Sequence, residues 1–167
     1  MGRDSPVQQS TVELRDRLEV SRDTLMDAIV GLDEEGFRAR PGASEWTAAE
    51  ALAHLLRMEA VLMQRTQAAL AEEGFVVTPV SPDERLEQVK LAQRMPVPQL
   101  LHGLLAQRRD TLRLLDGLSQ TQLTKTFHHP RWGERTIAWL FQHTAEHEEE
   151  HAAQIRALRV QKAATTP

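Results

Sequence analysis

The sequence predicts an all-α fold, a four-helix bundle in up-down-down-up order with a short extra helix between its second and third helices. Apolar residues recur at spacings of three and four through most of the chain, which is the pattern of one buried helix face. Strand signals are scarce, because the chain has no tyrosine and only Phe75–Thr78 looks extended. The length of 167 residues suits one core, so we expect a single domain over residues 1–167.

The first two long helices have recognisable boundaries. The first is expected from Val7 to Gly31, since glycine commonly follows the last turn of a helix. Thr47 with Glu50 three residues later forms a capping box, so the second helix is expected from Thr47 to about Glu73. The first helix carries its core candidates on one stripe: Leu14, Leu18, Leu25 and Ile29.

A long connection follows, over residues 74–98. Ser81 as N-cap and Pro82 in the first turn predict a short helix inside it, which Pro96 closes. A connection of this length can cross the bundle, so the second and third helices are expected to be parallel. This crossing is what gives the up-down-down-up order.

The third and fourth long helices are expected at Pro98–Leu115 and Arg135–Val160. A polar linker containing His128, His129 and Gly133 separates them. The third helix has these core candidates: Leu101, Leu104, Leu105, Leu112 and Leu115.

Composition narrows the class of protein. A net charge of −4 and a pI near 6.0 give no electrostatic reason to expect nucleic acid as a partner. No apolar run approaches the roughly 20 residues that span a bilayer, and residues 1–12 do not resemble a signal peptide, so we expect a cytoplasmic protein with no membrane partner. The chain has no cysteine. A metal site must therefore use histidine and carboxylate, and any thiol must come from a small molecule.

The most informative motif lies in the fourth helix, where His147 and His151 stand one turn apart. Taking about 100° per residue, both fall on or near the apolar stripe of that helix and therefore face the bundle interior. Glu148 also projects inward, and His143 sits at the margin of the stripe. Two inward imidazoles beside an inward carboxylate are difficult to satisfy without a cation, so the pattern favours a metal site.

The same stretch reads as H-E-x-x-H, the zinc-protease motif in which Glu148 would be the general base. A protease of this kind needs a third ligand downstream, but residues 152–167 contain no His, Asp or Glu. In the metzincin pattern that ligand would fall at Ala157. A helical bundle also lacks the sheet edge along which such proteases align a peptide, so the protease interpretation fails.

The third ligand must then come from upstream, and His54 on the second helix is the best candidate. His102 is the main rival, but its flank of the third helix looks exposed. His128 and His129 are expected to line the rim of a site. Glu59 occupies the centre of the apolar stripe of the second helix, where it either pairs with an arginine across the core or supports the site as an outer-sphere or proton-transfer group.

Three segments of the chain carry a family resemblance: Trp46–Leu55, His129–Thr136 and His147–Ile155. They are similar, in this order, to the second-helix signature, the loop before the last helix and the segment with the last ligands of the DinB/YfiT-like superfamily of metalloenzymes. The resemblance implies an up-down-down-up bundle, frequent homodimers and a three-histidine site for zinc, with nickel or another transition metal as alternatives. The ligands it implies are His54, His147 and His151.

Relatives with known chemistry are thiol-dependent transferases or isomerases that use bacillithiol or mycothiol, so the resemblance favours a metal-dependent thiol S-transferase acting on small electrophiles. Arg156 and Arg159 could then meet a carboxylate of the thiol cosubstrate, although their sequence context favours a solvated surface role. One alternative is a metal-dependent hydrolase with Glu148 or Glu59 as base. The other is a non-catalytic metal-binding or dimerisation module, in which His143 or Glu148 completes a closed shell.

Overall fold

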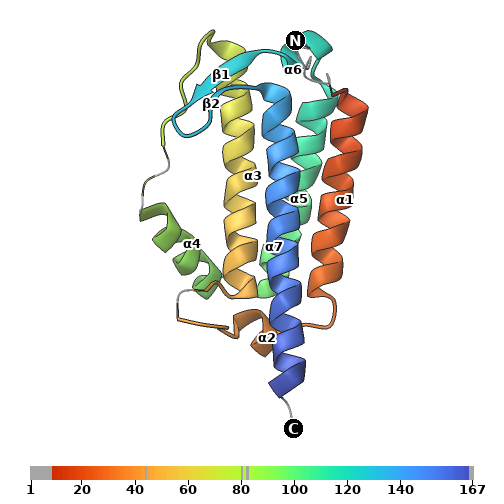
Figure 1. Ribbon diagram of the computed structural model, residues 1–167, viewed down its shortest axis with the longest axis vertical. Helices are drawn as coiled ribbons and strands as arrows, with labels where there is room; N and C mark the ends of the chain where they lie inside the picture. Colours follow the sequence, from red (N-terminus) through yellow and green to blue (C-terminus); the bar gives the residue numbers. More distant parts are fainter. Residues whose placement is uncertain (1–8, 44, 80, 82, 166–167) are drawn as a thin grey trace, which may run out of the picture.

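The computed structural model describes residues 9–43, 45–79, 81 and 83–165, with the side chains of residue 85 and of residues 159–165 left out. Four long helices dominate this part of the chain (Figure 1). Two of them, the first and the last, run in one direction and the other two run in the opposite direction, so the predicted up-down-down-up order is confirmed. The long helices are α1 (Thr11–Ile29), α3 (Ala48–Ala71), α5 (Val97–Asp116) and α7 (Ile137–Thr165).

The helix starts follow from side-chain capping. The Thr47 hydroxyl accepts the backbone N–H of Glu50, and the Glu50 carboxylate accepts the N–H of Thr47, as the capping box predicts. A second box, between Ser10 and Glu13, starts α1 at Thr11. The expected start of the first helix at Val7 lies outside the described residues.

The connections hold shorter elements. The predicted helix between the second and third long helices is present as α4 (Asp83–Arg94), beside two one-turn helices, α2 (Glu34–Arg38) and α6 (Gln120–Leu123). In Figure 1, α4 lies beside the lower half of α3, and the chain then re-enters the bundle at its lower end. This placement is what makes α3 and α5 parallel.

One element was not predicted. The linker before α7 forms an antiparallel hairpin of β1 (Thr126–His129) and β2 (Gly133–Thr136), with φ of +71° at the glycine that opens β2. The expectation that His128 and His129 lie in a loop is therefore wrong. The N–H of His128 also donates to Phe75 O at 2.8 Å, so the segment that looked extended in the sequence pairs with β1.

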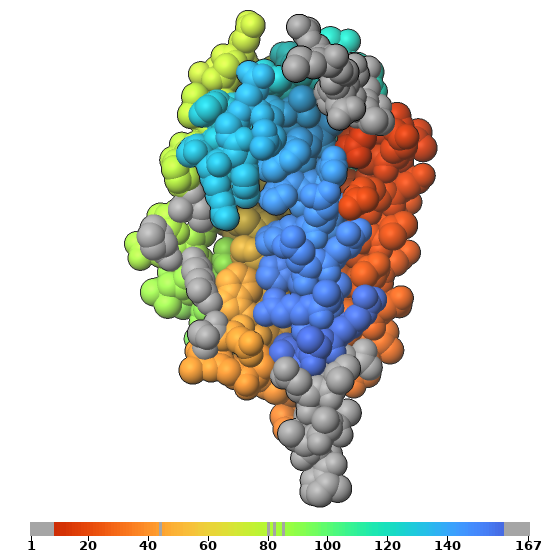
Figure 2. Space-filling model, viewed as in Figure 1, coloured from red at the N-terminus to blue at the C-terminus, as the bar shows by residue number. Residues whose placement is uncertain are grey.

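The core consists of two apolar clusters, one toward each end of the bundle. Each long helix supplies apolar residues to both clusters. A buried polar residue lies on each helix between these two sets of apolar residues. No helix of the described residues combines the length and apolar character needed to cross a membrane. In Figure 2 the hairpin, cyan, covers one end of the face between α3 and α7, and α3 is seen only in the gap between α4 and α7. The buried polar residues that lie between the clusters along these helices are Ser21, Arg22, Glu59, Arg108, Thr111 and Glu148.

One core assignment was wrong. Leu104 is 0% exposed, whereas Leu105, also expected in the core, is 44% exposed. Adjacent residues of a helix point about 100° apart, so both leucines cannot face the centre of a narrow stripe. The geometry of α5 places Leu104 there.

Leu104→Ala should lower the free energy of unfolding by about 2–5 kcal/mol, because it leaves a cavity in the core. Leu105→Ala, the matched control, should change it by less than about 1 kcal/mol. Urea denaturation of both variants measures the difference, and equal losses would contradict the burial of α5 described above.

Candidate metal centre

Three histidines meet between α3 and α7. His54 comes from α3, and His147 and His151 come from successive turns of α7. The Nε2 atom of His147 lies 3.2 Å from Nε2 of His54 and 3.2 Å from Nε2 of His151. All three ligand atoms lie within 4.8 Å of one another. The structure therefore brings together the three residues that the family resemblance names.

This geometry fits a tetrahedral divalent ion. Zinc–nitrogen bonds of 2.0–2.1 Å separate two nitrogens of a tetrahedral site by about 3.3 Å, close to the two measured spacings. Nδ1 of His54 lies 2.8 Å from the amide oxygen of Gln88, and Nδ1 of His151 lies 3.0 Å from that of Gln154. An amide oxygen only accepts, so each Nδ1 carries the proton and each Nε2 turns a lone pair toward the common point.

The histidines of the cluster do not readily take up a proton in place of the metal ion. Burial lowers the pKa of His147, the neighbouring His151 and His54 lower it further, and the combined effect brings it to about 3. Burial also lowers the pKa of His151. Neutral imidazoles with converging lone pairs are the form that binds zinc.

Trp46, in the turn before α3, packs on the histidine rings. Its indole is stacked on His151 with ring centroids 5.6 Å apart and an interplanar angle of 6°. It meets His54 edge-on, at 4.5 Å and 74°. These contacts restrict the rotation of two of the three rings.

A cavity of about 450 Å³ opens beside the cluster, between α3 and α7. His54 and His147 line one end of it, and Trp132 of the hairpin lines the other. His143 lies along this wall, one turn from His147, with ring centroids 6.2 Å apart. It is not a member of the three-histidine cluster.

The remaining histidines lie elsewhere. His102 is exposed on α5, as the sequence predicted, and His128 is exposed on β1. His129 is buried, and its Nδ1 accepts the backbone N–H of Arg131 at 3.1 Å. Its ring packs against Trp132 at 4.1 Å. His129 therefore supports the hairpin that closes one end of the cavity.

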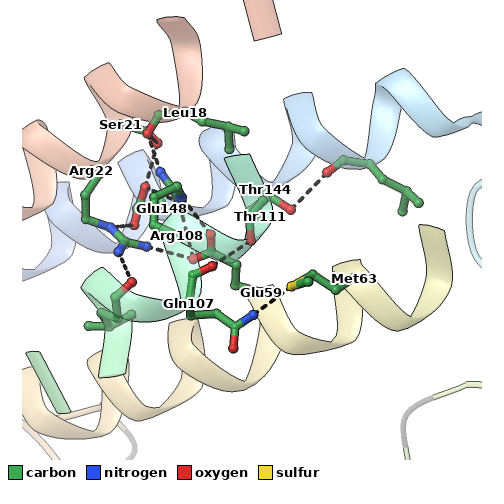
Figure 3. Close-up of polar contacts among 12 residues, drawn as sticks. Leu18, Ser21, Arg22, Glu59, Met63, Gln107, Arg108, Thr111, Thr144 and Glu148 are labelled. Carbon is green, nitrogen blue, oxygen red and sulfur yellow. Dashed lines mark hydrogen bonds and ion pairs between the residues drawn. The ribbon is translucent and has the colours of Figure 1, made fainter. Parts of the chain in front are cut away.

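The two catalytic candidates, Glu59 and Glu148, belong to a closed ring of buried ion pairs (Figure 3). Arg22 donates to Glu148 Oε1 at 2.6 Å and to Glu59 Oε2 at 2.7 Å. Arg108 donates to Glu59 Oε1 at 2.6 Å and to Glu148 Oε2 at 2.9 Å. Ser21 adds a hydrogen bond of 2.5 Å to Glu148 Oε2. We call these two arginines and two glutamates the charge ring.

Each arginine also donates to a backbone carbonyl, Arg22 to that of Leu104 and Arg108 to that of Leu18. Burial opposes the charge of Arg108, but Glu59 and Glu148 outweigh it and raise its pKa. Both glutamates therefore act as acceptors for guanidinium groups, which is the pairing across the core that the sequence left open for Glu59.

The sequence did not identify Arg22 and Arg108 as partners. A signal existed, since Arg22 interrupts the apolar stripe of α1 and Arg108 that of α5, in the same way that Glu59 interrupts α3. Of the two candidate anion-binding residues, Arg156 is exposed, is not among the residues that line the cavity, and donates to Thr24 O at 3.1 Å. The side chain of Arg159 lies outside the described residues.

The fold and the cluster define a four-helix bundle with a candidate metal site between its helices. The chain belongs to the DinB superfamily, whose family model matches residues 17–155, and this confirms the resemblance drawn from the sequence. No curated protein sequence matches it significantly.

Solved structures share the fold. YfiT from Bacillus subtilis, described as a probable metal-dependent hydrolase with an unusual four-helix bundle topology, matches with a TM-score of 0.82 and 19% identity over 98% of this chain and 93% of its own. The four-helix bundle protein TT2238 matches at 0.62 and 21%, over 89% of this chain and 99% of its own. A protein from Streptococcus pneumoniae matches at 0.65 and 17%, over 95% and 93%.

His54→Ala should weaken zinc binding by more than about 100-fold, because even the partners that orient metal ligands are worth 10–100-fold. His102→Ala removes an exposed histidine and should leave zinc affinity unchanged. Competition with a chromophoric chelator measures both. Parent-like affinity in the His54 variant would remove His54 from the ligand set.

Glu59→Gln should destabilise the fold by about 3–5 kcal/mol, because it leaves two buried guanidinium groups short of an anion. Glu149→Gln, on a half-exposed position of α7, is the control and should cost less than about 1 kcal/mol. Replacing the whole charge ring by Met and Leu should cost less than the single change, as judged by urea denaturation. A parent-like Glu59 variant would show that the ring is not formed in solution.

Proposed function

We propose that this protein is a metal-dependent thiol S-transferase acting on a small electrophile, with zinc as the metal and a low-molecular-weight thiol as cosubstrate. The observation that carries the proposal is the state of the two buried carboxylates beside the cluster. Glu59 and Glu148 line the cavity, but both are held by Arg22 and Arg108. A reaction that needs no carboxylate base therefore suits the site.

His54, His147 and His151 would hold the ion as neutral ligands and leave one position open toward the cavity. When bound, a divalent ion supplies Lewis acidity that lowers the pKa of a coordinated thiol. Gln88 and Gln154 fix the ring orientations through Nδ1. Met58 and Leu62 add apolar surface to the cavity wall beside the cluster.

In the net reaction the thiol proton passes to solvent and the sulfur forms a bond to the electrophilic carbon. The leaving group departs with the electron pair of the bond that breaks. In an epoxide that pair stays on the ring oxygen, which then takes up a proton. The chain has no cysteine, so the sulfur must come from the cosubstrate.

A hydrolase is the second candidate, favoured by His143. Burial lowers the pKa of this imidazole, so it is neutral near pH 7 and could accept a proton in the cavity. The description of YfiT as a probable metal-dependent hydrolase points the same way. The fold alone does not separate the two reactions, because the same scaffold can carry both.

A purely structural metal site is less well supported. Such a site needs a fourth protein ligand, and within the described residues only the three histidines form a group that could hold an ion. His143 and Glu148, the expected fourth ligands, stand outside that group. The homodimer implied by the family resemblance remains part of our proposal and is compatible with each of these roles.

The zinc-loaded protein should accelerate conjugation of a model electrophile, such as a monochloroalkane or an epoxide, to at least one low-molecular-weight thiol. Mass spectrometry follows the conjugate, with bacillithiol, mycothiol, glutathione and cysteine tested in parallel. His147→Ala should reduce the rate to that of the thiol alone, because the site then loses a ligand.

The control is His102→Ala, which should keep the parent rate. Ester hydrolysis without thiol is followed on the same samples. Hydrolysis by the parent together with no conjugation for any thiol would replace the transferase by the hydrolase.

A further inference from the structure

The cavity is longer than a metal site requires. It follows α3 from His54 to Arg65, which is about 16 Å of helix at 1.5 Å per residue. On the opposite wall it follows α7 from Glu150 back past His147 to Trp139. One end is therefore the histidine cluster, and the other end lies at the β-hairpin, whose Arg131 and Trp132 line it.

Three aromatic rings line the hairpin end. Trp132 lies 5.2 Å from Trp139 and 4.8 Å from His143, measured between ring centroids. Trp139 and His143 are stacked at 4.6 Å with an interplanar angle of 9°. Burial lowers the pKa of His143, so this imidazole is neutral near pH 7. Met58 and Leu62 of α3 add apolar surface to the same cavity. Such a surface suits a flat ring.

Arg65 also lines this cavity, and no described residue pairs with its guanidinium group. It is half-buried on α3, and within the described residues its guanidinium makes no hydrogen bond or ion pair. Burial lowers its pKa, against a weaker attraction from Glu84. A partly desolvated guanidinium without a partner is stabilised by an anion, which it can bind through two parallel hydrogen bonds.

The other charges at this end oppose a cationic ligand. The Arg131 guanidinium lies over the Trp132 ring and that of Arg135 over the Trp139 ring, each 5.5 Å from the ring centroid. One face of each indole is thus in contact with a guanidinium, and the positive charges of the two arginines disfavour a cationic ligand. Among the carboxylates that line this cavity, only Glu150 lies outside the charge ring and could attract a cation. Its side chain is exposed to solvent.

We infer that this cavity binds an electrophile that combines a flat aromatic group with an anionic group, a carboxylate or a phosphate. The ring lies against Trp132, Trp139 and His143, and the anion pairs with Arg65. This rests on the proposed function in one respect, namely that the reactive carbon points toward the histidine cluster. An aliphatic thiol would leave the aromatic wall without a partner, so we assign this end of the cavity to the electrophile.

The test is calorimetric titration with two probes of matched shape, 2-naphthylacetate and the neutral 2-(2-naphthyl)ethanol. Metal-free and zinc-loaded protein are both titrated, because a carboxylate could also bind the metal. The acid should bind at least about tenfold more tightly than the alcohol in both forms. Arg65→Gln should abolish this preference and leave the affinity for the alcohol within about twofold.

Two further variants make the result specific. Arg57→Gln removes the same charge from the same helix at an exposed position outside this cavity, and should keep the preference. Trp139→Leu should weaken both probes at least about threefold without changing their ratio, because stacking does not depend on the charge. If Arg65→Gln does not fold, as judged by circular dichroism, Arg65→Lys should retain part of the preference.

Three results would overturn the inference: no binding of either probe by the parent, an unchanged preference in the Arg65→Gln protein, or a preference confined to the zinc-loaded form. Probe binding and thiol conjugation are independent readouts. If conjugation fails while the Arg65-dependent preference holds, the proposed reaction is wrong and the substrate class stands. If conjugation succeeds without that preference, the proposed reaction stands and the substrate class is wrong.

Discussion

The charge ring is the constraint on which the rest of the bundle depends. Each long helix supplies one member, and in each helix that member stands between the two apolar clusters. Apolar contacts alone tolerate sliding of one helix along another by a turn, but buried charges do not, because a misplaced partner leaves an ion unpaired. The ring thus fixes the axial register of all four helices at a cost in desolvation.

This register is what assembles the histidine cluster. Glu148 is adjacent to His147 on α7, and Glu59 follows His54 by little more than one turn on α3. Arg22 and Arg108 bind both glutamates, so they hold α3 and α7 at the height where the Nε2 atoms of His54 and His147 are 3.2 Å apart. The carboxylates then contribute to the site through position, whereas the imidazoles contribute the donor atoms.

Local signals in the sequence accounted for most of the fold. The capping box at Thr47 and the helical spacing of the leucines are properties of single helices. The lack of a ligand downstream of His151 pointed to His54 on the second helix, and the family resemblance implied the same residue. What escaped prediction depends on pairs distant in sequence. Arg22 and Arg108 could be recognised as interruptions of apolar stripes, but not matched to Glu59 and Glu148. The two hairpin strands have four residues each and contain one apolar residue between them, Phe127, so no alternation of apolar and polar residues marks them in the sequence.

The hydrogen bond between Gln88 and His54 gives the crossing connection a second role. Surface connections between helices commonly accept insertions and deletions, because their length changes little beyond loop entropy. Here α4 carries the buried Gln88 that receives Nδ1–H of His54 at 2.8 Å. A length change on either side of α4 rotates or displaces that acceptor. The position of this connection must therefore be kept to within a few tenths of an ångström, as in a coordination site. An ordinary surface loop has no such restriction.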